Sequence, residues 1–356
     1  MQLKQLELEG GGTLTVYLRD PCERMPKAID RPLVLVVPGG GYTHVSAREG
    51  DPVALQFVAA GYHAAVLDYA ICEQAKDGLP LRQLAQAIGL VRQHAAQWHI
   101  LPKKIAVCGF SAGGHLALSS AVLEIPGERA QPRPNAVILG YPVITAGQYA
   151  HRGSFVQLAG STDPAAQQAF GLEDKITPQT PPVFVWSTME DTTVPVENTL
   201  MLVSALHRAG VPCEAHLFEK GVHGTSISTA EVDQPSRHRH HWVELAVEWL
   251  GDTFDWLVKS DIFERTYKNF TIKLLTCISL WRILVSRDKL KEEYLWLWTR
   301  PCRAFLCATC SCRHFLPDGS FQTRQFRRTN TCRAPFRSSR CCRWNPKMST
   351  PRRAWA

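Results

Sequence analysis

One short stretch of the chain has the spacing of a serine nucleophile. An apolar segment leads into Gly109-x-Ser111-x-Gly113, and a segment typical of a helix follows. Small neighbours let a strand and a helix approach closely at such a turn, which holds the central residue in a strained backbone conformation. The Ser111 hydroxyl then projects from the sheet edge, and the N–H of Ala112 points toward any oxyanion formed beside it. We therefore expect Ser111 to attack an acyl carbon and Ala112 to stabilise the oxyanion.

A serine hydroxyl needs a general base, and His223 is the best-placed histidine for that role. It lies in a glycine-flanked loop after the last predicted strand, free of a helical face that would bury it. The strongest alternatives lie in a charged segment that is more simply explained as a solvated helix start: His238, His240 and His241. The other candidates are His94, His99 and His207, which fall in helical stretches, and His115, which we expect to pack in the first turn of a helix.

An acid must orient that base, and Asp191 is the residue we predict for it. It follows a predicted strand in the sequence Glu190-Asp191-Thr-Thr-Val-Pro195, so Glu190 is the neighbouring alternative. A solvated loop acid or a helix cap would also fit this position. The order serine, aspartate, histidine along the chain is the one expected when a Gly-x-Ser-x-Gly turn lies on an α/β sheet.

A second glycine-rich loop, Pro38-Gly39-Gly40-Gly41, can complete the oxyanion site. The N–H groups of Gly40 and Gly41 are its predicted donors, because glycine lets the backbone lie against a reacting carbonyl. A plain turn and a phosphate-binding loop are alternatives, but no Lys-Ser or Lys-Thr pair follows, as a P-loop would require. Tyr42, the next residue, is the candidate for substrate binding. This chemistry requires no metal and no cofactor, and we expect neither.

Eight apolar or alternating segments predict the strands of one sheet: residues 3–8, 13–18, 33–37, 63–69, 104–108, 136–141, 183–187 and 213–218. The first two form an antiparallel hairpin, and helical segments separate the others, which indicates a mainly parallel sheet with helices on both faces. One helix opens at Asp51-Pro52, where we expect the aspartate to cap it, and another covers residues 80–98. Residues 145–181 have no long regular period and leave room for only a minimal cap. Each candidate residue follows a strand, where open α/β sheets bind ligands.

Residues 1–257 resemble the α/β-hydrolase superfamily, and within it the compact esterases with a Pro-Gly-Gly-Gly-Tyr oxyanion loop, a group that includes acetyl-xylan-type and other short-acyl carbohydrate esterases. The motifs that carry the resemblance are Val37 to Tyr42, Glu49 to Pro52, Gly61 to His63, Leu67 to Tyr69, Gly109 to His115, Gly140 to Pro142, Glu190 to Pro195 and Gly221 to Gly224. The resemblance implies a serine esterase, a carboxylic ester hydrolase that cleaves short acyl esters, acetyl esters of carbohydrates among them. Its partner would be a small-molecule ester.

Two features qualify this resemblance. Pro38 stands where lipase-like relatives have histidine, so their lid and lipid preference are not carried over. The segment from Asp191 to Pro195 is also similar to that of prolyl-oligopeptidase-type domains, so a serine peptidase is an alternative function. Oligomeric state is not predicted.

Charge divides the chain into two parts. Residues 1–257 have a formal net charge of −7, whereas residues 258–356 have +15. The first part, the predicted catalytic domain, therefore gives no reason to expect nucleic-acid binding. It has four scattered cysteines, as expected of reduced thiols, and neither a signal peptide nor a membrane span is evident before residue 270. We expect a cytoplasmic location.

Residues 258–356 are rich in arginine, cysteine and tryptophan without periodicity, which predicts a poorly ordered extension or a segment that is not a native domain. Residues 270–286 are too short and too charged to predict a membrane span. Cys307-x-x-Cys310 has the spacing of a zinc site, but no second such pair follows. Basic residues are interleaved with Phe and Trp here, so a non-catalytic protein that binds nucleic acid or metal through this segment is the third functional hypothesis.

Overall fold

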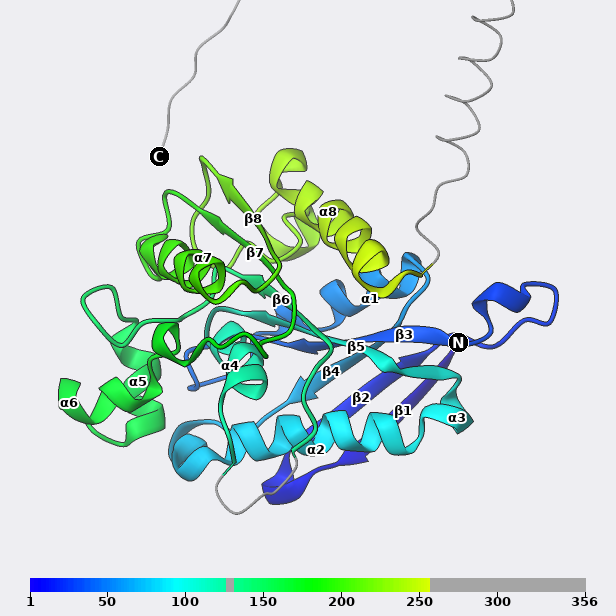
Figure 1. The fold of residues 1–356 in the computed structure, drawn as a ribbon, viewed down its shortest axis with the longest axis horizontal. Helices are drawn as coiled ribbons and strands as arrows, with labels where there is room; N and C mark the ends of the chain where they lie inside the picture. Colours follow the sequence, from blue (N-terminus) through cyan, green and yellow to red (C-terminus); the bar gives the residue numbers. More distant parts are fainter. Residues whose placement is uncertain (126–130, 257–356) are drawn as a thin grey trace, which may run out of the picture. The chain divides into compact units, whose positions relative to one another are not determined.

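The computed structural model describes residues 1–125 and 131–256, which form a layered α/β fold (Figure 1). Its eight-stranded sheet has the order β1-β2-β4-β3-β5-β6-β7-β8. The strands are β1 Gln2–Glu7, β2 Thr13–Leu18, β3 Arg31–Val37, β4 His63–Asp68, β5 Ile100–Phe110, β6 Ala136–Gly140, β7 Val183–Thr188 and β8 Cys213–Phe218. Strand β2 is antiparallel to β1 and to β4, and all other pairs are parallel. The predicted hairpin and the mainly parallel sheet are confirmed.

The helices cover both faces of the sheet, as the unbroken apolar strands predict. They are α1 Asp51–Ala59, α2 Leu79–Gln93, α3 Ala95–Trp98, α4 Ser111–Val122, α5 Arg152–Ala159, α6 Pro164–Gln167, α7 Glu197–Ala209 and α8 Arg237–Phe254. Side chains of β3 alternate between two buried clusters: Leu33 and Leu35 pack in the cluster that includes α2, α4 and α7, whereas Val34 and Val36 pack with α1 and α8. Figure 1 shows these two sets of helices on opposite sides of the sheet.

Two local expectations need correction, and a third is confirmed. Asp51 does not cap α1: Gly50 is the N-cap residue, and the Asp51 carboxylate accepts a hydrogen bond from the Tyr17 hydroxyl on β2. The helix predicted over residues 80–98 is divided at His94 into α2 and α3. Residues 145–181, expected to lack long regular structure, contain α5 and α6. These helices have only eight and four residues, so the predicted minimal cap is confirmed.

Several sequence predictions concern the end of the chain. The domain boundary at residue 257, the poorly ordered extension, the apolar segment 270–286 and the Cys307-x-x-Cys310 pair all lie outside the described residues. Within the described ranges, no helix combines the length and the apolar character needed to span a bilayer. The four cysteines of these ranges, Cys22, Cys72, Cys108 and Cys213, are free thiols, as predicted.

Candidate active site

The turn between β5 and α4 has the strained geometry that its glycines predict. Ser111 has a positive φ of 52°, which is uncommon for a residue with a side chain. A Cβ on Gly109 would lie 2.2 Å from the carbonyl oxygen of Gly113, and a Cβ on Gly113 would lie 2.2 Å from that of Val37. Only glycine fits at these two positions. The close packing of strand and helix therefore holds Ser111 at the carboxyl end of β5.

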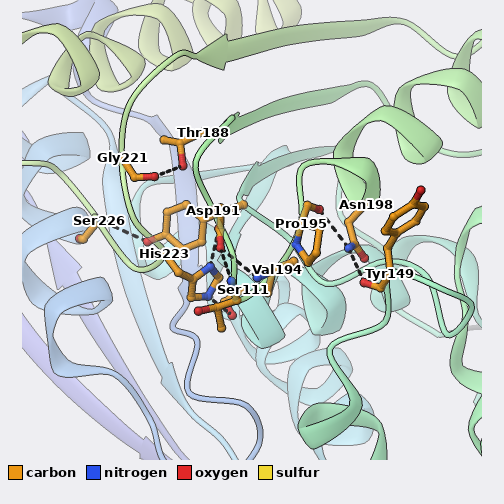
Figure 2. A network of polar contacts seen from close by, with 12 residues as sticks. Ser111, Tyr149, Thr188, Asp191, Val194, Pro195, Asn198, Gly221, His223 and Ser226 are labelled. Carbon is orange, nitrogen blue, oxygen red and sulfur yellow. Dashed lines mark hydrogen bonds and ion pairs between the residues drawn. The ribbon is translucent and has the colours of Figure 1, made fainter.

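Ser111, His223 and Asp191 are joined by two hydrogen bonds, although they follow three different strands (Figure 2). The Ser111 hydroxyl donates to His223 Nε2 at 2.8 Å, and His223 Nδ1 donates to Asp191 Oδ2 at 2.6 Å. The second carboxylate oxygen of Asp191 accepts from the N–H groups of Thr193 and Val194, at 3.0 and 2.9 Å. The Asp191 side chain is fully buried. This geometry can transfer a proton from the serine hydroxyl to the imidazole.

Glu190, the alternative acid, holds the histidine loop at a different point. Its carboxylate accepts from the N–H of Gly221 at 3.0 Å, and the Thr188 hydroxyl donates to the carbonyl oxygen of the same glycine at 2.7 Å. Of the alternative histidines, His240 donates from Nδ1 to the carbonyl oxygen of Ile227. Glu190 and His240 therefore hydrogen-bond to backbone groups and take no part in the Ser111–His223–Asp191 triad.

The glycine loop after β3 leaves backbone donors beside Ser111. Gly40 has a φ of +127°, and a Cβ there would lie 1.9 Å from the carbonyl oxygen of His44, so only glycine fits. The carbonyl oxygen of Gly40 accepts from Thr43 and His44 within the turn. In residues 1–125 and 131–256 the N–H groups of Gly40 and Gly41 donate to no protein group. Ala112 is the second residue of α4, so its N–H has no acceptor four residues back within the helix.

A buried carboxylate, which the sequence reasoning did not single out, links this loop to the histidine loop. Glu49 is 3% exposed; one oxygen accepts from the N–H of Gly39 at 2.7 Å and the other from the Tyr141 hydroxyl at 2.6 Å. The Tyr141 oxygen also accepts from the N–H of Ser226, and its ring centre lies 4.9 Å from that of His223. Burial, and then the charge of Glu49, raise the pKa of Tyr141 well above its usual value. The only sequence signal was the family-like Glu49-Gly50-Asp51-Pro52 motif.

Tyr42, the candidate for substrate binding, lies in the core. It is 1% exposed, and its hydroxyl donates to His115 Nδ1 at 2.9 Å. The Nε2–H of His115 donates to the carbonyl oxygen of Phe170 at 2.8 Å. His115 is thus the packing residue that the sequence predicts, and Tyr42 ties the glycine loop to it. This position of Tyr42 does not favour contact with a substrate.

Protonation of His115 should destabilise the fold at acidic pH. Burial lowers its pKa from 6.5 to about 4, so the unfolded chain binds a proton more readily between these values. We therefore expect the free energy of unfolding to be retained above about pH 6.5 and to fall as pH decreases toward 4, by roughly 3 kcal/mol from this residue.

Urea unfolding of the full chain across this pH range checks the expected loss of stability. His115→Gln should give a shallower slope, with the rest due to groups such as His63, whose pKa is also lowered to about 4, chiefly by burial. An equal slope in the variant would contradict the prediction.

A cavity of about 330 Å³ opens beside Ser111 and His223. Glycine backbone and polar side chains form most of its wall, among them Thr43, Arg48 and His151. No aliphatic side chain, and no aromatic ring other than imidazole, lines it within the described residues.

Comparison with known proteins agrees with the fold. The BD-FAE family model matches residues 23–129. The structure of MGS-M1, an α/β-hydrolase enzyme from a Medee basin deep-sea metagenome library, is 36% identical, with a TM-score of 0.61 over 72% of this chain and 98% of that one. The acetyl ester-xyloside bifunctional hydrolase of Caldicellulosiruptor lactoaceticus is 34% identical, with a TM-score of 0.61 over 68% of this chain and 89% of that one.

A curated relative is similar over part of its length. Endo-1,4-beta-xylanase B of Butyrivibrio fibrisolvens is 36% identical over 215 residues, which are 57% of this chain and 34% of the xylanase. The chain thus spans about a third of that relative. From the near-complete coverage of MGS-M1 at this identity, the chain belongs to the α/β-hydrolase family. Its described domain is a carboxylic ester hydrolase, since the solved structures similar to it include a carboxylesterase and an acetyl ester hydrolase.

Proposed function

We propose that this protein hydrolyses short acyl esters of carbohydrates, acetyl esters in particular, through an acyl-enzyme formed on Ser111. The observation that carries the proposal is the pair of hydrogen bonds that joins Ser111, His223 and Asp191 at the wall of a small polar cavity. The names of the relatives, one an acetyl ester-xyloside hydrolase and one a xylanase, support the choice of carbohydrate esters.

In the first half of the reaction Ser111 becomes acylated. Its Oγ attacks the ester carbonyl carbon while its proton passes to His223 Nε2, and Asp191 stabilises the imidazolium that results. The carbonyl oxygen becomes an oxyanion, which accepts hydrogen bonds from the N–H groups of Gly40, Gly41 and Ala112. The bond between the carbonyl carbon and the alcohol oxygen then breaks, and His223 returns the proton to the departing alcohol.

In the second half a water molecule replaces the alcohol. His223 removes a proton from this water, the hydroxide attacks the acyl carbon, and the same N–H groups stabilise the second oxyanion. When the acyl–Ser111 bond breaks, the proton on His223 passes to Ser111 Oγ. The products are a carboxylic acid and the free alcohol, and the enzyme is restored.

The size of the cavity gives the first test of this proposal. We expect kcat/KM for 4-nitrophenyl esters to fall at least about tenfold from acetate to octanoate, because no aliphatic side chain of the described residues lines the cavity to pack against the longer chain. Stopped assays with acetylated xylo-oligosaccharides should release acetate. A series in which octanoate is the better substrate would contradict the short-acyl proposal, and faster cleavage of peptide amides than of esters would favour the serine peptidase alternative.

A further inference from the structure

One cavity residue outside the triad has a free polar atom in a fixed position. His151 lies at the N-terminus of α5 and lines the same cavity as Ser111 and His223. Its Cε1 atom lies 3.7 Å from the place that a Cβ on Gly41 would occupy, so the imidazole is beside the proposed oxyanion loop. The sequence reasoning did not consider this histidine, because it follows no predicted strand and belongs to no recognised motif.

The contacts of the His151 ring determine which nitrogen carries the proton. Nδ1 caps α5 by accepting from the N–H of Ser154 at 3.3 Å, and the Ser154 hydroxyl lies 2.9 Å from the same atom. Ser154 is fully buried. A neutral imidazole that accepts at Nδ1 carries its hydrogen on Nε2. Burial and the nearby His223 lower the pKa of His151, which favours this neutral form.

The Nε2–H group of His151 is available to a ligand. Within residues 1–125 and 131–256 it has no hydrogen-bond partner, whereas Nδ1 has two donors beside it. An unpaired N–H group of a cavity-lining side chain loses little by exchanging water for a ligand oxygen, and it discriminates against ligands that lack such an oxygen.

The backbone that carries His151 is tied to the loop that carries Asp191. The side-chain amide of Asn198, which is fully buried, donates to the carbonyl oxygens of Tyr149 at 2.9 Å and of Pro195 at 3.1 Å (Figure 2). On the other side of His151, the guanidinium of Arg152 donates to the carbonyl oxygen of Ala146 at 2.8 Å. The ring is therefore held in place before a substrate arrives, as selective recognition requires.

We propose that His151 is a specificity-determining residue, which donates from Nε2 to a free hydroxyl on the alcohol part of the ester. The acyl oxygen accepts hydrogen bonds from the N–H groups of Gly40, Gly41 and Ala112. The alcohol part of the ester is therefore what His151 can contact. The site then selects esters of polyhydroxylated alcohols, such as partly acetylated sugars, over esters of simple alcohols. This inference rests on the proposed ester hydrolysis at Ser111 and concerns which alcohol is accepted.

The test compares two acetate esters that differ only in the alcohol: a monoacetylated methyl xyloside, with free hydroxyls, and ethyl acetate, with none. In the full chain, His151→Phe should lower kcat/KM for the xyloside ester about tenfold and that for ethyl acetate less than about twofold, the loss expected for one hydrogen bond. His151→Gln keeps an N–H donor and should recover part of the loss. His207→Phe, the same change at an exposed position on α7, should alter neither value.

The possible outcomes separate the two proposals. An equal loss on both esters, or no loss on either, would overturn the role of His151 while the ester hydrolysis stands. A wild-type protein that cleaves neither ester would contradict the proposed function itself. If His151→Phe lowers the melting temperature, His151→Ser decides the question, because serine keeps an oxygen that can cap α5 but removes the Nε2–H donor. A xyloside-to-ethyl-acetate ratio below the wild-type value supports the proposal, and an unchanged ratio overturns it.

Discussion

Replacing Ser111 by alanine should reduce kcat for short acyl esters on the order of a millionfold. The variant lacks the only atom that can form the acyl-enzyme, whereas the backbone donors of the oxyanion loop are retained. Hydrolysis of 4-nitrophenyl acetate, measured at enzyme concentrations high enough to detect the residual rate, checks this expectation. A fluorophosphonate probe should label the wild-type protein at Ser111 and leave the variant unlabelled.

The control for this change is the melting temperature of the variant, which shows whether the fold is retained. Ser111 is 6% exposed, and within the described residues its hydroxyl hydrogen-bonds only to the imidazole of His223, so Ser111→Ala should keep the wild-type melting temperature within a few degrees. Near wild-type hydrolysis by a folded Ser111→Ala variant would exclude an acyl-enzyme on Ser111, whereas failure of the probe to label the wild-type protein would favour the non-catalytic hypothesis.

Asp191→Asn should lower kcat about ten-thousandfold while the fold is retained. The asparagine oxygen can still accept from the N–H groups of Thr193 and Val194, which hold the loop. Its NH₂ group, however, would face His223 Nδ1 and favour the tautomer that carries hydrogen on Nε2. That nitrogen could then no longer accept the proton of Ser111.

Glu190→Gln is the matched control for this change, one residue away. The Glu190 side chain accepts from the N–H of Gly221, and a glutamine oxygen can accept the same hydrogen bond. We therefore expect kcat to change less than about tenfold. Steady-state kinetics of both variants on one ester compare the two acids directly. A larger loss in Glu190→Gln than in Asp191→Asn would transfer the orienting role to Glu190.

Much of the architecture could be predicted because buried strands have a distinctive local pattern. The apolar run of β3 has no alternation, since helices cover both of its faces, and each of the eight predicted strands is present. Predictions failed where a side chain had a distant partner. Asp51 resembles a helix cap in the sequence, but its carboxylate pairs with Tyr17 on another strand. Rules that consider only neighbouring residues cannot predict that contact.

In the active site, too, local features could be predicted from the sequence, whereas long-range contacts could not. Gly109 and Gly113 predict a tight turn from sequence alone, because a Cβ at either position would overlap a neighbouring carbonyl oxygen. Tyr42 follows the glycine loop in sequence, yet it points into the core toward His115. The direction of its side chain depends on the packing of α4 against the loop, which sequence spacing does not specify.

The sequence by itself determined the positions of the strands along the chain, the nucleophile turn and a small set of candidate bases and acids, since each depends on residues close together in the chain. Only the tertiary structure decided which of them meet. Ser111 and His223 are 112 positions apart, and they lie within hydrogen-bonding distance because parallel strands present their carboxyl ends at one edge of the sheet. The buried carboxylate of Glu49 and the free Nε2 of His151 follow from the same long-range contacts. Glu49 belongs to a family-like motif and His151 to none, but in neither case does the local sequence specify the contacts of the side chain.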